Sequence, residues 1–159
     1  MFPLTLGSVS LLAKSAPPGN EHPLLLDPGS LVNPVEHIEY VEKAIGKPGN
    51  PTYWWARPRC SSLYGSKTIE VCDLNRSELL GLRNDHFRTV IAPQIEALND
   101  ALGDSQLVNI KREFRRAMGL LSPENIHVGF TYDALRASVP DSHLGNFNGL
   151  RWPLPSQVC

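Results

Sequence analysis

The clearest hydrophobic pattern in the chain runs from residue 107 to residue 121 and has the spacing of an α-helix. Apolar residues recur there at Leu107, Ile110, Phe114, Ala117 or Met118, and Leu121. This spacing places them along one side of a helix, where they can pack against a core. Asp104 or Ser105 precedes the pattern and can cap the helix at its N-terminus.

Helical spacing also extends from Ser77 to Gly103, with an interruption at Pro93. The apolar positions are Leu79, Leu80, Leu82, Phe87, Val90 and Ile91 before the proline, and Ile95, Leu98 and Leu102 after it. Proline lacks an N–H donor and clashes with the preceding turn, so the pattern predicts a break or kink near Ala92. Pro93 then opens a second helix, which ends at Gly103.

An earlier helix is predicted from Pro34 to Ile45. Asn33 can cap it, proline suits the first helical position, and Glu36 stands where a capping box places its acid. The apolar side of this helix would consist of Val35, Ile38, Val41 and Ile45, and Gly46 would end it.

Three segments have the composition or the alternation of β-strands: Thr52–Arg57, Thr68–Leu74 and Ile126–Tyr132. The first, TYWWAR, directs Tyr53 and Trp55 to one face and Trp54 to the other. The second is expected to pair with the first as a hairpin, behind a turn at residues 64–67. Residues 133–138 are expected to add one helical turn.

Together these elements predict a single α+β domain. It would hold a small, mainly antiparallel sheet of about three or four strands, with about three or four α-helices packed on it. Proline and glycine are dense at both ends of the chain. We therefore expect residues 1–32 to form an irregular proline-rich arm, residues 33–139 the domain, and residues 140–159 an irregular tail.

Composition narrows the possible partners and compartments. Lys and Arg number 15 against 16 Asp and Glu among 159 residues, so the net charge of −1 argues against nucleic acid as the partner. No apolar run approaches the ~18 residues of a membrane-spanning helix. Residues 1–16 weakly resemble a secretory signal, but no basic residue precedes their apolar part. We expect a cytoplasmic protein, with secretion as the alternative.

The cysteines and the short motifs point to neither a cofactor nor a metal. Cys60, Cys72 and Cys159 contain no C-x-x-C spacing. Cys60 and Cys72 flank the predicted hairpin, and the sequence leaves open whether they are reduced or bridged. The stretch GSKT at residues 65–68 departs from a phosphate-binding loop because lysine does not follow glycine directly.

One group of residues suggests a catalytic site. His127 lies on a predicted strand beside Gly129, whose missing side chain could admit a ligand. His127 could act as a general acid or base, and Tyr53, Trp55 and Tyr132 could shape the cavity. Solvent-facing alternation explains His127 equally well.

Two other groups suggest binding surfaces. Lys111, Arg112, Arg115 and Arg116 place cations on the polar side of the helix over residues 107–121, where they could dock an anionic partner. Tyr53 and Trp55 form an aromatic sheet face. Our leading hypothesis is a non-catalytic binding or accessory module for an unknown small molecule or protein. The alternatives are a cofactor-independent lyase, isomerase or hydrolase, and a small secreted interaction protein.

Overall fold

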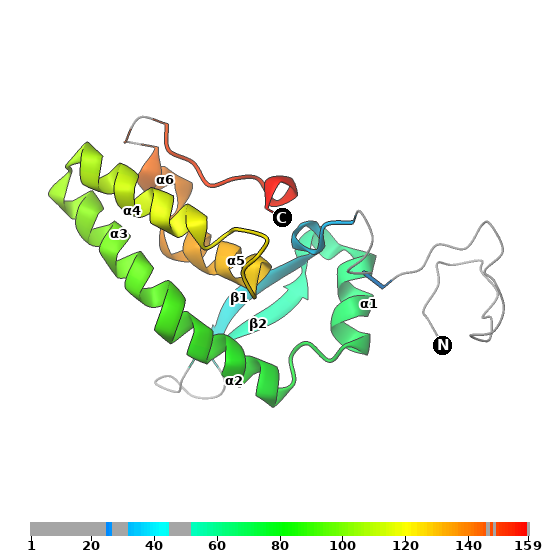
Figure 1. Ribbon diagram of the computed structural model, residues 1–159. Coiled ribbons are helices and arrows are strands. Elements are labelled where there is room, and N and C mark those ends of the chain that lie inside the picture. Colours follow the sequence, from blue (N-terminus) through cyan, green and yellow to red (C-terminus); the bar gives the residue numbers. More distant parts are fainter. Residues whose placement is uncertain (1–24, 27–31, 45–51, 146, 148, 159) are drawn as a thin grey trace, which may run out of the picture.

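The computed structural model describes residues 25–26, 32–44, 52–145, 147 and 149–158. They form a small α+β fold, as predicted, with a β-ribbon that lies among the helices (Figure 1). The elements follow in the order η1 (Pro34–Glu36), β1 (Ile38–Ala44), β2 (Thr52–Pro58), η2 (Arg59–Ser61), α1 (Leu63–Val71), α2 (Ser77–His86), η3 (Phe87–Ile91), α3 (Ala92–Asp104), α4 (Leu107–Gly119), α5 (Val128–Ser138), α6 (Asp141–Leu144) and η4 (Pro155–Gln157).

The sheet is a ribbon of β1 and β2, which pair antiparallel from Ile38 opposite Pro58 to Ala44 opposite Thr52. The predicted strand at Thr52–Arg57 is confirmed as β2, and its alternation holds. Trp54 is buried on the inner face, while Tyr53 and Trp55 are half-buried on the outer face. The expected three or four strands reduce to these two among the described residues.

Side chains from residues 75–84 bond to the free edge of β2. Both polar atoms of the Asn75 side-chain amide form hydrogen bonds: the oxygen accepts from the Ala56 N–H at 2.8 Å, and the nitrogen donates to the Ala56 carbonyl at 2.9 Å. Arg83 donates to the Trp54 carbonyl at 2.8 Å, and Asn84 donates to the Thr52 carbonyl at 3.1 Å. These bonds satisfy backbone groups that no third strand satisfies among the described residues.

The helix predicted from Pro34 to Ile45 is wrong beyond its first turn. Asn33 caps that turn as expected, because its side chain accepts from the Val35 N–H at 2.9 Å. The turn ends at Glu36, and the chain continues as β1. The β-branched residues Ile38 and Val41 suit a strand, and pairing with β2 supplies the backbone hydrogen bonds that a helix would otherwise make.

The strand predicted at Thr68–Leu74 is also wrong, because α1 covers most of it. Ser62 caps α1 by accepting from the Gly65 N–H at 3.2 Å. Gly65 is not part of a turn, and it permits close packing, because a Cβ atom at this position would clash with the His37 carbonyl oxygen. The helix therefore rests directly on the backbone that leads into β1.

The helices α2 and α3 are joined through η3 into one continuous helical run (Figure 1). The predicted break near Ala92 is instead a π-helical segment, in which the Ala92 N–H bonds to the Phe87 carbonyl. This wider turn ends just before Pro93, which has no N–H to donate. The following helix, α4, confirms the pattern at residues 107–121.

The third predicted strand, Ile126–Tyr132, is wrong, since α5 begins at Val128. Every residue from Phe130 to Leu135 is buried, so the middle of this helix is enclosed on all sides. A helix surrounded in this way shows no amphipathic period and resembles a buried strand in sequence. It forms the centre of the core, together with buried residues of η1, β2, η3, α3, α4 and the C-terminal segment, among them Trp54, Leu98, Ala117, Trp152 and Val158.

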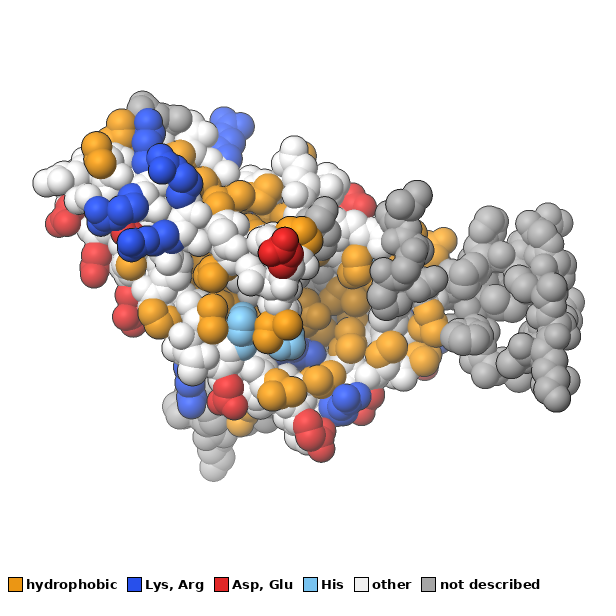
Figure 2. Space-filling model, in the orientation of Figure 1, with side chains coloured by type: hydrophobic (Ala, Val, Ile, Leu, Met, Phe, Trp, Pro, Cys, Tyr) orange, Lys and Arg blue, Asp and Glu red, His pale blue; other side chains and the backbone are white. Residues whose placement is uncertain are grey.

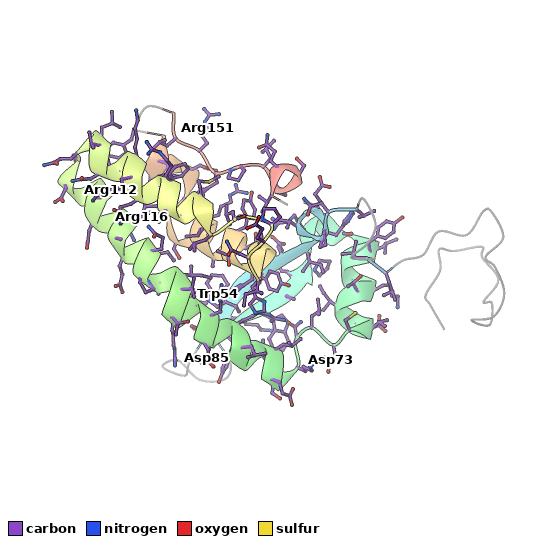
Figure 3. The ribbon with its side chains drawn as sticks, viewed as in Figure 1. Trp54, Asp73, Asp85, Arg112, Arg116 and Arg151 are labelled. Carbon is purple, nitrogen blue, oxygen red and sulfur yellow. The ribbon has the colours of Figure 1, made fainter. Side chains whose placement is uncertain are left out.

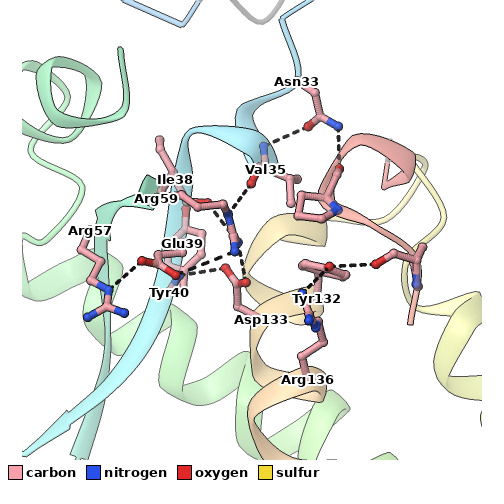
Figure 4. Close-up of polar contacts among 12 residues, drawn as sticks. Asn33, Val35, Ile38, Glu39, Tyr40, Arg57, Arg59, Tyr132, Asp133 and Arg136 are labelled. Carbon is pink, nitrogen blue, oxygen red and sulfur yellow. Dashed lines mark hydrogen bonds and ion pairs between the residues drawn. The ribbon is translucent and has the colours of Figure 1, made fainter. Parts of the chain in front are cut away.

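An ion-pair network ties α5 to the sheet (Figure 4). Asp133 accepts from the Tyr40 N–H at 2.8 Å and from Arg59 at 2.5 Å. Arg59 also donates to the Val35 carbonyl at 2.7 Å and lies 3.7 Å from Glu39. Burial raises the pKa of Asp133, although the hydrogen bond from Arg59 acts in the opposite direction.

Several residues of the C-terminal segment contact the rest of the fold. Trp152 is 5% exposed and donates from its indole to the Val139 carbonyl at 2.7 Å. The Asn33 side chain donates to the carbonyls of Pro155 and Val158 at 3.0 and 2.9 Å. The described residues of this segment thus connect the end of α5 to the cap of η1.

Three further predictions concern the ends of the chain, the membrane and the cysteines. The signal-like segment 1–16 and most of the predicted arm lie outside the described residues, although the Leu26 N–H bonds to Thr68 at 3.0 Å. In the described part of the chain, no helix has the length and apolar character to cross a membrane. Cys60 and Cys72 are both free thiols and both exposed.

Candidate functional site

The four predicted cations of α4 lie together on one helical surface. We call this set, Lys111, Arg112, Arg115 and Arg116, the basic face. Ile110 and Ala117 on the opposite side of α4 are fully buried, which turns the basic face outward. Figure 2 shows basic side chains gathered over α4, with acidic side chains along its border.

A buried acid, Glu113, holds part of the basic face in place. Glu113 is only 4% exposed and accepts from Arg112 at 2.8 Å and from Arg116 at 3.0 Å. The hydrogen bond from Arg112 contributes most to lowering the Glu113 pKa; Arg116 and Gln94 add to the effect, and burial opposes it. The two guanidinium groups remain open to solvent, with 56% and 63% of their side chains exposed.

Lys111 and Arg115 form no ion pair with any described residue. Their positive charges are therefore available to bind an anionic group, and the two side chains lie one turn from each other on the same helix. Arg112 and Arg116 project from α4, and Arg151 of the C-terminal segment lies at the same end of the molecule (Figure 3). Val108, one turn before Arg112, is 78% exposed. The basic face thus borders an exposed apolar side chain.

The second predicted surface is the outer face of the ribbon. Tyr53 and Trp55 lie there as predicted, opposite Lys43 and Val41 of β1. The Lys43 ammonium lies 4.9 Å from the centre of the Trp55 ring, within range of a cation–π contact. This face is small, and both aromatic residues are already half-buried.

The two predicted catalytic residues have different surroundings. Tyr132 is fully buried; its hydroxyl donates to the Pro153 carbonyl at 2.8 Å and accepts from Arg136 at 2.9 Å (Figure 4). His127 is exposed at the start of α5, and its ring centre lies 5.2 Å from that of His86. Tyr132 therefore joins α5 to the C-terminal segment, while His127 belongs to a histidine pair.

Sequence reasoning missed His86, which lies in α2 far from His127 along the chain. Its imidazole is 3.3 Å from the Thr131 hydroxyl and lines a cavity of about 260 Å³. Val90, Leu120, Asn125, Ile126 and Thr131 line the rest of this cavity. A helix-to-helix contact of this kind leaves no local spacing signal in the sequence.

Both histidines favour their neutral form. Partial desolvation of the imidazole rings lowers the pKa of His86 and of His127. The neighbouring His127 lowers the pKa of His86 further, and Arg83 lowers the pKa of His127 further. No carboxylate of the described residues hydrogen-bonds to either ring. In the same part of the chain, no three His, Cys, Asp or Glu side chains gather closely enough to hold a metal ion.

Comparison of the chain with protein-family models, with curated proteins and with solved structures finds no match.

Proposed function

We propose that the protein is a non-catalytic binding module that docks an acidic protein segment on the basic face of α4. The observation that supports this most is the contact of Glu113 with Arg112 and Arg116. A buried carboxylate orients both guanidinium groups without covering them. Oriented, exposed guanidinium groups can bind carboxylates in a forked geometry with little loss of side-chain freedom.

The local charge favours an anionic partner although the whole chain is nearly neutral. Four cations of the basic face stand against the single carboxylate of Glu113, so this surface carries about three net positive charges at neutral pH. Such a patch attracts acidic partners and speeds their association, mainly at low ionic strength.

The chemistry of the basic face favours an acidic polypeptide over a nucleic acid. Proteins that bind single strands place aromatic side chains among their cations so that bases can stack. The four basic positions of α4 are instead interleaved with Glu113 and Phe114, and Phe114 packs inward on Trp152 with ring centres 5.0 Å apart. Exposed Val108 offers an apolar contact to a peptide side chain.

The test compares two variants of equal charge. Lys111→Gln/Arg115→Gln removes the cations without ion pairs, and Arg76→Gln/Arg88→Gln removes two exposed cations from elsewhere. Binding of a fluorescent oligo-glutamate peptide should weaken about tenfold in the first variant only, and should weaken for the parent as salt rises. Equal binding by both variants, or binding indifferent to salt, would contradict the proposal. Tighter binding to single-stranded DNA or phosphatidylserine vesicles would replace it.

A cofactor-independent enzyme is the second candidate, and the histidine pair beside the 260 Å³ cavity favours it. Neutral imidazoles can act as general bases near neutral pH. Hydrolysis of a panel of activated esters should then be lost in both His86→Ala and His127→Ala but retained in His143→Ala. An equal background rate in all of these variants would exclude this activity.

A further inference from the structure

A second hollow lies on the inner side of β1, away from the basic face. Pro34, Val35, Ile38, Tyr40 and Gly129 line it, and its volume is about 170 Å³. Figure 2 shows a hollow with hydrophobic walls near the middle of the molecule, with histidine side chains at its edge. We call the space lined by these five residues the β1–α5 hollow.

A glycine of α5 keeps the β1–α5 hollow open. A Cβ atom at Gly129 would lie 3.3 Å from a methyl carbon of Val35 and 3.9 Å from the edge of the Tyr40 ring. The first distance is shorter than ordinary van der Waals contact, so a methyl group there would occupy part of the hollow. Cavities near this size that are lined by apolar side chains can hold a benzene-sized molecule.

Among the residues that line the hollow, Tyr40 carries a polar side-chain group, and that group has no hydrogen-bond partner in the described part of the chain. The Tyr40 ring lies between Arg83 and Phe130, 5.0 Å from the Arg83 guanidinium carbon and with its centre 5.7 Å from that of Phe130. No described residue hydrogen-bonds to the Tyr40 hydroxyl. Burial raises the pKa of Tyr40, so the hydroxyl stays protonated and remains a donor. A secluded donor without an acceptor is costly unless a ligand or water supplies one.

Behind Tyr40 lies a buried positive charge. Arg83 is only 4% exposed, and it donates to the carbonyls of Trp54 and Leu74. No carboxylate of the described residues pairs with it. Most buried cations are paired with an acid, because an unpaired buried charge is strongly destabilising. An anion in the β1–α5 hollow would offset this charge at short range.

We propose that the β1–α5 hollow binds a small monocarboxylate with a benzene-sized apolar body. The body lies among Val35, Ile38 and Gly129, and the carboxylate accepts a hydrogen bond from the Tyr40 hydroxyl within the field of Arg83. A single negative charge balances the single buried cation. The neighbouring histidines are neutral at pH 7 and leave that balance unchanged.

The experiment uses the full chain and three probes of similar shape, namely benzoate, benzamide and toluene. Binding is measured by calorimetry and by chemical-shift changes near β1 and α5. Benzoate should bind at least about tenfold more tightly than the two neutral probes, because they cannot balance the charge of Arg83. Equal affinity for benzoate and benzamide would overturn the proposal, as would no binding of benzoate.

Two variants place the site in the hollow. Gly129→Ala should reduce benzoate affinity at least about tenfold, whereas Gly81→Ala, a helical glycine with nothing within 4 Å of an added Cβ, should leave it unchanged. Tyr40→Phe removes a hydroxyl that bonds to no described residue, so it should keep its unfolding midpoint while losing about tenfold in affinity. Unchanged benzoate affinity in folded Gly129→Ala and Tyr40→Phe would overturn the assignment.

Discussion

Asp133 and Arg59 form the shortest ion pair of the described residues, at 2.5 Å, and both side chains are largely secluded, with 10% and 14% exposed. Arg59 follows β2 and Asp133 lies in the middle of α5. The pair therefore joins the ribbon to the central helix.

Asp133→Ala should reduce the free energy of unfolding by about 3–5 kcal/mol, because it leaves the Arg59 charge secluded and the Tyr40 N–H without its acceptor. Chemical denaturation measures this loss. The control, Glu70→Ala, removes the exposed pair with Lys67 and should cost only about 0–1 kcal/mol. Equal losses in the two variants would show that the Asp133 pair does not hold the ribbon to α5.

The histidine pair should make the protein less stable in mild acid. The pKa of His86 and of His127 lies below the ordinary 6.5, so the unfolded chain binds more protons than the folded chain. This contribution to stability is complete above about pH 6.5 and is lost as the pH falls through the folded pKa values. Thermal melts should show the decline, and His127→Gln should have a shallower one. An equally steep decline in His127→Gln would assign the effect to other groups.

The orientation of α4 can be tested with two substitutions on the same helix. Ile110 is fully buried and Val108 is 78% exposed. Ile110→Ala should cost about 2–5 kcal/mol of unfolding free energy, since it leaves a cavity in the core. Val108→Ala should change the stability by no more than about 0.5 kcal/mol. Similar losses from both would mean that the basic face is not the exposed side.

The approach of α1 to η1 predicts that Gly65 does not tolerate a side chain. Gly65→Ala places a Cβ atom against the His37 carbonyl and should destabilise the protein by about 1–3 kcal/mol. The matched change Gly81→Ala meets no neighbour and should stabilise the protein by about 0.5–1 kcal/mol through helix propensity. Denaturant titration of both variants distinguishes the effect of packing from that of helix propensity. A gain of stability in both variants would contradict the close approach of α1 to the His37 carbonyl.

The exposed thiols of Cys60 and Cys72 should both react rapidly with a thiol reagent in the native protein. Replacing both with serine should change the unfolding free energy by about 1 kcal/mol or less. A loss of about 2–5 kcal/mol, together with unreactive native thiols, would indicate a disulfide bridge in the natural protein.

The sequence predicts a helix or strand well where one face of the element is exposed to solvent. In α4 the alternation of Ile110 and Ala117 with exposed arginines marks both the helix and its basic face. In β2, aromatic content and alternation place Trp54 inside and Trp55 outside. These patterns depend only on local spacing, so no tertiary information is needed to interpret them.

The sequence predicts the wrong secondary structure where tertiary contacts determine which element forms. The sequence around Ile38 fits a helix as well as a strand, and pairing with β2 determines the outcome. Phe130 and its neighbours in α5 are buried on all sides, so their periodicity carries no helical signal. The same reasoning applies to the sites. The burial of Glu113, the approach of Arg83 to Tyr40 and the approach of His86 to His127 all depend on packing between separate elements.

The bonds along both edges of the ribbon have a consequence for how partners can attach. Asn75, Arg83 and Asn84 occupy backbone groups of β2, while Asp133 binds the Tyr40 N–H of β1 and Arg59 reaches the Ile38 carbonyl. A short ribbon whose edge N–H and carbonyl groups were unpaired could accept an added strand. Many domains bind peptides in this way, and exposed edges also aggregate in this way. Here several edge groups on both strands are already bonded to side chains. These side chains obstruct the pairing of an added strand at the positions that they occupy.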